Sequence, residues 1–311
     1  MRNLLFLTLL LFSNFKLLAQ TSNDINETKI QLNENNIQLF GTLCLPYEMK
    51  NKIPIILLIS GSGPTDRNGN NQMMTNNSLK YLAHELAKKG IASIRYDKRG
   101  IGESSIPQLD ESKLTFDDYI SDAKNWVTLI KKDERFNSII IAGHSEGSLI
   151  GMLASKNNVN KFISISGAGE PIDQTLKKQL KHLPDQLKNE AYGIIDSLKN
   201  GKIVRNINLN LTTLFRQSVQ PYLISWFKYN PVEEFNKLTI PNLVIQGDMD
   251  IQVSIENAKN LSPQSAVIIQ KMNHVLKNVD AKEDISSYYN PDLPINKELV
   301  DTIIHFILRN N

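Results

Sequence analysis

A pentapeptide near the middle of the chain has the residue types of an activated nucleophile. Gly143-His144-Ser145-Glu146-Gly147 fits the pattern G-x-S-x-G, directly after the apolar run 138–142 and at the start of a helix-forming run. Glycines at both ends allow a sharp turn that larger side chains would obstruct, so the serine hydroxyl projects beyond the end of a strand. The bare pattern also occurs in surface turns, but a strand before it and a helix after it favour Ser145 as a nucleophile.

A serine hydroxyl is a weak nucleophile and needs a base that takes its proton. Four of the five histidines are poorly placed for this role. His84 and His305 stand inside predicted helices, His182 lies in the helical middle of the chain, and His144 is next to the serine itself. His274 follows the last predicted strand, on a loop that can reach back toward the nucleophile. We therefore expect His274 to be the base.

A carboxylate must hold the base in the correct orientation. Asp248 and Asp250 both follow the apolar run 240–246. Asp250 lies farther past the strand and has more freedom to turn toward a histidine, so we favour it and keep Asp248 as the alternative. The order along the chain is then Ser145, Asp250, His274: nucleophile, acid, base.

Attack on a carbonyl places negative charge on its oxygen, which backbone N–H groups can stabilise. The N–H of Glu146 follows the nucleophile directly and stands at a predicted helix N-terminus. A second N–H is expected from the loop Gly61-Ser62-Gly63, with Ser62 as the candidate; the alternative is a plain glycine-rich turn. The loop lacks the Lys-Ser/Thr ending of a phosphate-binding loop.

The elements that must position these residues alternate along the chain. A hairpin is expected at 29–33 and 37–45, followed by strands at 53–60, 91–97, 138–142, 161–166, 240–246 and 266–270. Helices are expected at 78–89, with Ser78 as its cap and Gly90 as its stop, and at 116–132, 147–155, 254–261 and 299–308. Near-continuous apolar strands that alternate with helices predict an α/β fold with a mostly parallel sheet flanked by helices.

The alternation stops between residues 168 and 237, where helical segments and an aromatic cluster occur. So long a connection between two strands predicts a helical cap inserted into the domain. Its aromatic side chains either line a substrate pocket or form a small core of the cap itself: Phe215, Tyr222, Trp226, Phe227 and Tyr229.

Composition and the N-terminus narrow the class of protein. The 311 residues carry 35 basic and 32 acidic side chains, a formal charge of +3, without a basic run that would indicate nucleic-acid binding. The single cysteine, Cys44, excludes an intramolecular disulfide. Arg2, the apolar run 4–12 and Ala19 predict that residues 1–20 are a cleavable signal peptide of a secreted or periplasmic protein. That run is too short to span a bilayer, so residues 21–311 are expected to be the mature domain.

With these residues in place, the chain resembles the α/β-hydrolases, in the branch of carboxylic ester hydrolases and serine aminopeptidase-like enzymes. The resemblance runs over 39–308 and is carried by the segments 61–64, 66–69, 95–104, 143–147, 220–226, 246–253 and 273–274. It implies the α/β-hydrolase fold and cleavage of carboxylic esters through an acyl-serine intermediate. Many relatives have His-Gly where this chain has Ser60-Gly61, which leaves the donor of the second N–H group less defined.

Two other functions compete with ester hydrolysis. A serine aminopeptidase for short peptides would use the same residues and an acidic side chain of the cap, with Glu233, Glu234 and Asp173 as candidates for the free amine. A binding module without catalysis has no need of serine, aspartate and histidine together. The mechanism requires neither a cofactor nor a metal, and the sequence leaves the oligomeric state open.

Other polar residues near the predicted cleft edge invite either a structural or a binding role. Asp97, Arg99 and Ser104 follow one strand, and we expect them to hold a loop, with Asp97 and Arg99 paired. Asp66 and Arg67 either stabilise their own loop as a pair or bind a charged group of the substrate.

Overall fold

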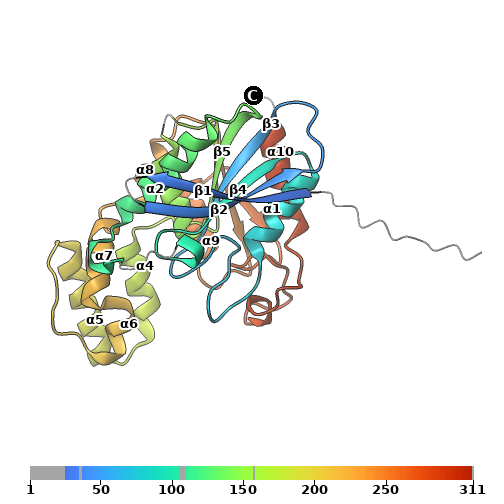
Figure 1. Ribbon diagram of the computed structural model, residues 1–311. Coiled ribbons are helices and arrows are strands. Elements are labelled where there is room, and N and C mark those ends of the chain that lie inside the picture. The colour runs from blue at the N-terminus through green and yellow to red at the C-terminus, as the bar shows by residue number, and fades with distance from the viewer. Residues whose placement is uncertain (1–24, 35–36, 105–108, 157, 310–311) are drawn as a thin grey trace, which may run out of the picture.

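The computed structural model describes residues 25–34, 37–104, 109–156 and 158–309, and its centre is an eight-stranded sheet (Figure 1). The strands lie in the order β1-β2-β4-β3-β5-β6-β7-β8. Their bounds are β1 Ile25–Glu34, β2 Ile37–Pro46, β3 Ile53–Ile59, β4 Ala92–Tyr96, β5 Phe136–His144, β6 Lys161–Ile165, β7 Asn242–Gly247 and β8 Val267–Ile269. Strands β1 and β2 form an antiparallel hairpin, β2 pairs antiparallel with β4, and the remaining neighbours are parallel. The predicted mostly parallel sheet is confirmed.

The central strand β3 explains why both faces of the sheet are covered. Ile55 and Leu57 belong to the apolar core on one face, whereas Ile56 and Leu58 belong to the core on the other. Because successive side chains of a strand point to opposite faces, an unbroken apolar run requires helices on both sides.

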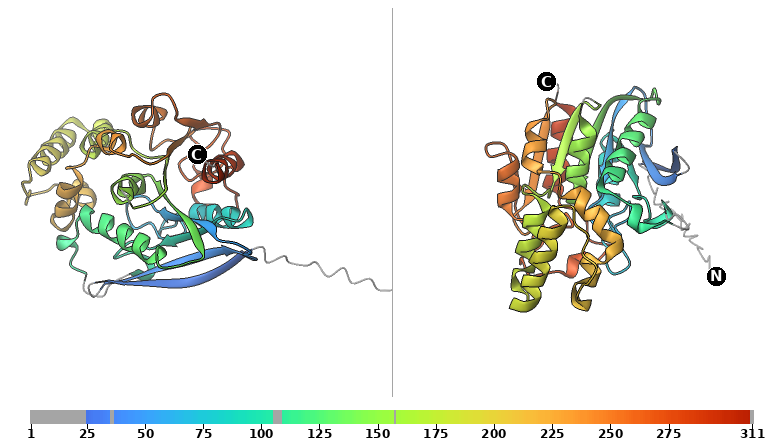
Figure 2. Two further views of the ribbon diagram at one scale, coloured as in Figure 1. Left: turned by 90° about the horizontal axis from the view of Figure 1, so that it is seen from above. Right: turned by 90° about the vertical axis from the view of Figure 1, so that its left-hand side faces the viewer.

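Helices supply that cover from both sides (Figure 2). Helices α2 (Phe116–Ile130), α3 (Glu146–Ser155) and α9 (Ile255–Leu261) contribute to the first core. Helices α1 (Ser78–Lys88) and α10 (Lys297–Leu308) contribute to the second. Cys44 is fully buried in this second core, so the single thiol is shielded from solvent.

Helix α1 begins differently from the expectation. Ser78 is its first residue and not its cap, because Asn77 precedes it in the left-handed region with φ 54°. The Ser78 N–H is bound by Asn76 Oδ1 at 3.0 Å instead. Gly90, with φ 82°, ends the helix as predicted, since this conformation favours glycine.

Between β6 and β7 the chain forms a lobe of helices beside the sheet (Figures 1 and 2). It contains α4 (Ile172–Gln179), α5 (Asp185–Lys199), α6 (Thr212–Phe215), α7 (Gln220–Trp226) and α8 (Pro231–Asn236), all within the expected insertion 168–237. We call these helices the cap.

The cap aromatics divide between the two roles that the sequence left open. Phe215 and Phe227 are buried in a small core of the cap itself. Trp226 stacks on Phe116 of α2, with ring centroids 5.2 Å apart and planes 4° from parallel. Tyr222 packs against both rings and also lines a cavity that is described below. The cap is therefore fastened to the domain through α2.

A buried ion cluster holds the loop after β4. The Asp97 carboxylate accepts hydrogen bonds from the Arg67 backbone N–H and guanidinium, both at 2.7 Å, and from the Glu103 N–H at 2.9 Å. Arg99 turns away and pairs with Asp122 of α2. The structural role expected for Asp97 is present, but its partner is Arg67 and not Arg99, because α2 presents two carboxylates to Arg99.

The neighbouring residues of this loop also serve the fold. Ser104 Oγ donates to the Asp97 carbonyl and accepts the Phe40 N–H, both at 2.8 Å. Asp66 accepts the N–H groups of Asn68 and Asn70, and so shapes its own loop without pairing with Arg67.

The predicted signal peptide, residues 1–20, lies outside the described residues and stays a prediction. In the part of the chain that the structure describes, no helix is both long and apolar enough to cross a bilayer.

Candidate active site

Ser145 occupies a strained turn between β5 and α3. Its backbone has φ 55° and ψ −121°, a conformation that non-glycine residues rarely adopt. A Cβ atom on Gly143 would lie 2.0 Å from the Gly147 carbonyl oxygen, and one on Gly147 would lie 2.3 Å from the Ile59 carbonyl oxygen. Both glycines are thus required for the close approach of helix α3 to strands β5 and β3, which forces the turn at Ser145.

The structure brings Asp250 and His274 together. Asp250 follows β7 and His274 follows β8, so both stand at the carboxyl edge of the parallel strands, the edge at which β5 delivers Ser145. His274 Nδ1 and Asp250 Oδ2 are 2.8 Å apart, and both side chains are buried. Asp248, the alternative acid, makes no hydrogen bond to His274 among the described residues.

The surroundings of Asp250 keep it ionised. Its Oδ1 accepts the N–H groups of Gln252 and Val253, at 2.8 and 2.9 Å, and its Oδ2 also accepts Gln246 Nε2 at 2.9 Å. Burial by itself raises the pKa of Asp250, but the charge and hydrogen bond of His274 and the two backbone N–H groups outweigh it and lower the pKa to about 2. A carboxylate that is charged at neutral pH fixes Nδ1 of His274 as the protonated nitrogen and leaves Nε2 free to accept a proton.

His144 connects the turn at Ser145 to the loop of His274, a role that the sequence analysis missed. His144 Nε2 lies 2.8 Å from the His274 carbonyl oxygen, and the two rings are 4.7 Å apart between centroids. Burial, together with the charge of His274, lowers the pKa of His144 to about 3, so it is neutral and donates its Nε2–H. Its position beside Ser145 in G-x-S-x-G was the available signal.

Ser145 and His274 are joined through this contact and not directly. Within the described residues, no hydrogen bond connects the Ser145 hydroxyl to the His274 imidazole. Of the three residues predicted from the sequence, the structure pairs Asp250 with His274 by a hydrogen bond. Ser145 is linked to His274 through its neighbour His144.

Both candidate N–H donors belong to segments next to Ser145, since Glu146 follows it in the chain and Ser62 lies in the loop after β3. A Cβ atom on Gly61 would be 3.1 Å from Ser145 Cβ, so the loop after β3 packs directly on the turn at Ser145. The Ser62 carbonyl accepts Thr65 Oγ1 at 2.9 Å, which closes this loop. Over the described ranges, the N–H groups of Ser62 and Glu146 have no protein acceptor, as a site for a substrate oxygen requires.

Solved structures of other proteins share the fold of this chain. Est1E from Butyrivibrio proteoclasticus with bound ferulic acid is 18% identical, covers 90% of this chain and 98% of its own, and has a TM-score of 0.61. The α/β-hydrolase GrgF from Penicillium sp. sh18 is 14% identical, covers 91% of this chain and 98% of its own, and has a TM-score of 0.58. This chain has the α/β-hydrolase fold.

Sequence comparisons find similarity to two kinds of enzyme. A family model described as serine aminopeptidase, S33, matches residues 74–206. Esterase EstD of Thermotoga maritima is 24% identical over 275 residues, which are 82% of this chain. The match spans 62% of the length of that relative.

A cavity of about 310 Å³ lies beside the candidate N–H donors. Gly63 and Pro64 of the loop after β3 line it, together with Glu146, and the rings of Tyr119 and Tyr222 close it from α2 and the cap. Its two carboxylates are neutralised within the protein, since Glu146 pairs with Lys98 at 3.0 Å and Glu111 pairs with Arg216. The cavity thus combines apolar and aromatic walls with charges that already have partners.

The acidic residues proposed for an amine-binding site do not line this cavity. Glu234 pairs with Lys156 and Lys237, at 2.6 and 2.8 Å, and Asp173 pairs with Lys199. Glu233 accepts a hydrogen bond from Asn230 beside it. Their charges serve contacts within the cap and between the cap and the sheet domain.

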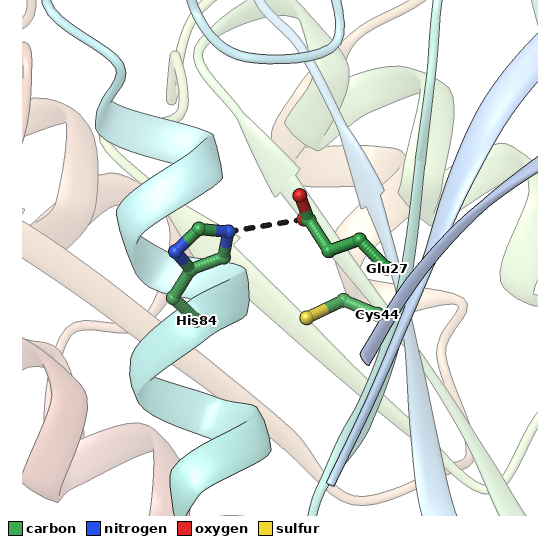
Figure 3. A group of neighbouring side chains, drawn as sticks. All are labelled: Glu27, Cys44 and His84. Carbon is green, nitrogen blue, oxygen red and sulfur yellow. Dashed lines mark hydrogen bonds and ion pairs between the residues drawn. The ribbon is translucent and has the colours of Figure 1, made fainter. Parts of the chain in front are cut away.

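A second cluster brings together Glu27 of β1, Cys44 of β2 and His84 of α1, with ligand-type atoms within 4.8 Å of one another (Figure 3). The Glu27 carboxylate oxygen already binds His84 Nε2 at 3.0 Å and the Arg95 guanidinium at 2.6 Å. Burial, and then the charge of Glu27, raises the pKa of the Cys44 thiol to about 11, whereas metals bind the thiolate. A guanidinium on the ligating oxygen and a protonated thiol do not fit a cation site, and we assign the cluster to holding α1 on the hairpin.

The buried His144 makes a specific prediction about acid stability. Its pKa in the folded protein, about 3, lies below the ordinary value of 6.5. As pH falls below about 6.5, the unfolded chain binds a proton that the folded chain does not, so the free energy of unfolding should decrease down to about pH 3. His144→Gln keeps an N–H donor without a titrating group. Its free energy of unfolding should therefore depend less steeply on pH, by the contribution of about one proton.

Urea unfolding of wild type and His144→Gln between pH 4.5 and 7 measures the difference. His182→Gln, at an exposed position of the cap, is the matched control and should follow the wild type. An unchanged slope in His144→Gln would contradict a buried neutral imidazole.

Proposed function

We propose that this α/β-hydrolase cleaves carboxylic esters through an acyl-serine intermediate on Ser145, with His274 as base and Asp250 as the acid that orients it. The observation that carries the proposal is the buried Asp250–His274 hydrogen bond of 2.8 Å at the sheet edge where the strained turn presents Ser145. Nucleophilic serines of this kind need such a base and a fixed tautomer. The name of the related Esterase EstD supports the reaction type.

The chemistry follows from the positions of the protons. His274 Nε2 takes the hydroxyl proton as Ser145 Oγ attacks the ester carbonyl, and the N–H groups of Ser62 and Glu146 bind the resulting oxyanion. His274 then gives that proton to the alkoxide, which leaves as the alcohol. Water repeats the attack on the acyl-serine with His274 as base, and the carboxylic acid and free Ser145 are the products.

Ester hydrolysis is favoured over peptide hydrolysis by the charge of the cavity. An aminopeptidase has to bind a protonated amine, for which an unpaired carboxylate near the nucleophile is the natural partner. The two carboxylates of this cavity already pair with Lys98 and Arg216. The description of the matching family as serine aminopeptidase keeps the peptidase as the second candidate.

Replacement of the nucleophile should abolish turnover. Ser145→Ala removes the attacking oxygen, and hydrolysis of p-nitrophenyl butyrate should fall by about 10⁴-fold or more. A fluorophosphonate probe should label wild type once and leave Ser145→Ala unlabelled. Ser197→Ala, at a half-buried serine of α5 far along the chain from the site, should retain both properties. Turnover or labelling that survives in Ser145→Ala would refute the assignment, and an unlabelled wild type would favour the binding module.

The two aspartates near the end of β7 should differ sharply. Asp250→Asn keeps the shape but loses the charge that fixes the imidazole tautomer, and kcat should drop by about 10³–10⁴-fold. Asp248→Asn should stay within about threefold of wild type. Steady-state kinetics with both variants checks this, and the reverse order of the two effects would make Asp248 the acid.

Substrate preference should follow the neutralised cavity. We expect p-nitrophenyl butyrate to be hydrolysed with a kcat/KM at least about 10²-fold higher than alanine or proline p-nitroanilide. The N-acetylated anilide serves as a matched substrate, because it has the same amide bond as the free-amine anilide but lacks the positive charge of the amine. A free-amine anilide that outperforms both its acetylated form and the ester would establish the aminopeptidase instead.

A further inference from the structure

We propose that Lys98 is a positioning residue that orients both backbone donors of the oxyanion site. The inference rests on the proposed ester hydrolysis and adds a residue that the triad chemistry does not use. Lys98 follows β4 and Asp97, and its side chain is only 1% exposed. Full burial of an ammonium group is costly, so a long charged side chain in this place calls for an explanation.

The ammonium group contacts both halves of the oxyanion site. Lys98 Nζ donates to the Gly61 carbonyl at 2.6 Å and to Glu146 Oε1 at 3.0 Å. It also lies 5.1 Å from the centroid of the Tyr119 ring, which supplies a third favourable contact. Gly61 precedes the candidate donor Ser62, and Glu146 is the second candidate donor.

The contact with Gly61 fixes the direction of the Ser62 N–H group. A trans peptide is planar, so the carbonyl of Gly61 and the N–H of Ser62 belong to one rigid unit and point in opposite directions. Holding the carbonyl oxygen on Lys98 therefore prevents this peptide from rotating. Because Gly61 packs on Ser145 Cβ, a rotation here would move the donor relative to the nucleophile.

The contact with Glu146 acts on the other donor. The Glu146 side chain is 2% exposed and pairs with Lys98. The loop after β4, which carries Lys98, therefore holds the first residue of α3 in place. A buried ion pair adds little stability compared with apolar packing, but separating its partners leaves an uncompensated buried charge, so the two side chains stay together. The pair thus links the loop after β3, the loop after β4 and the start of α3 at one point.

Loss of the contacts of Lys98 with Gly61 and Glu146 should destabilise the transition state more than the bound substrate. Lys98→Met keeps the apolar stem and removes the ammonium group, so kcat for p-nitrophenyl butyrate should fall by about 10²-fold. KM should stay within about threefold, because Met keeps most of the side-chain volume of Lys98 where it lines the cavity. The affinity for a trifluoromethyl ketone, which forms a tetrahedral adduct, should fall about as much as kcat. Lys124→Met, at an exposed position of α2, is the matched control and should equal wild type in all three measurements.

A double variant separates positioning from charge balance. Lys98→Met alone leaves the buried Glu146 charge without its partner and risks unfolding, whereas Lys98→Met/Glu146→Gln removes both charges at similar volume. The double variant should fold, shown by cooperative urea unfolding, and should remain about 10²-fold slower than wild type because the Gly61 carbonyl still lacks its donor. Recovery to within threefold of wild type would overturn the proposal, since Lys98 would then only neutralise Glu146.

The result is distinguishable from failure of the proposed function. Wild type that neither hydrolyses esters nor reacts with a fluorophosphonate would overturn both proposals together. Active wild type combined with an unaffected Lys98→Met variant would overturn the role of Lys98 alone. A fall in ester turnover with a parallel rise in KM, and with ketone affinity unchanged, would make Lys98 a substrate-binding residue and would also contradict positioning.

Discussion

The close packing of α3 against β5 and β3 is the constraint on which the rest of the site depends. Backbone atoms of Gly143, Gly147 and Ile59 approach so closely that a single Cβ atom at either glycine would overlap a carbonyl oxygen. The chain can leave β5 and enter α3 only through an unfavourable conformation at Ser145. That conformation places the serine at the strand edge and the N–H of Glu146 at a helix N-terminus, so one packing contact positions two functional groups.

A second theme is that the buried charges of the described sheet domain are held by several partners at once. Asp250 is bound by His274 and two backbone N–H groups, and Asp97 by the backbone and side chain of Arg67. Lys98 binds one carbonyl and one carboxylate. Since an unpaired buried charge is strongly destabilising, each such group fixes the loops that carry its partners. The loops at the carboxyl edge are thereby ordered by electrostatics where they lack regular secondary structure.

The cap helps to determine the shape of the cavity beside the candidate site. Its own core makes it a small packed unit, and Phe116 of α2 anchors it through the ring of Trp226. Tyr222 stands at the boundary, in contact with this anchor and with the cavity beside Glu146. The shape of the cavity is thus set by where the cap rests on α2, while Ser145, Asp250 and His274 belong to the sheet domain.

Local patterns were enough to predict the parallel sheet, the turn at Ser145 and the candidate base His274: apolar runs, two glycines and a histidine after the last strand. The sequence ranked Asp250 above Asp248 without deciding between them, and the structure pairs the Asp250 carboxylate with His274 at 2.8 Å. Three further features came from tertiary structure: Arg67 as the partner of Asp97, His144 as a support for His274, and Lys98 between Gly61 and Glu146. Each joins segments that are distant in the chain, and the direction of a side chain across such a gap depends on how strands and helices pack, which residue types and spacing do not encode.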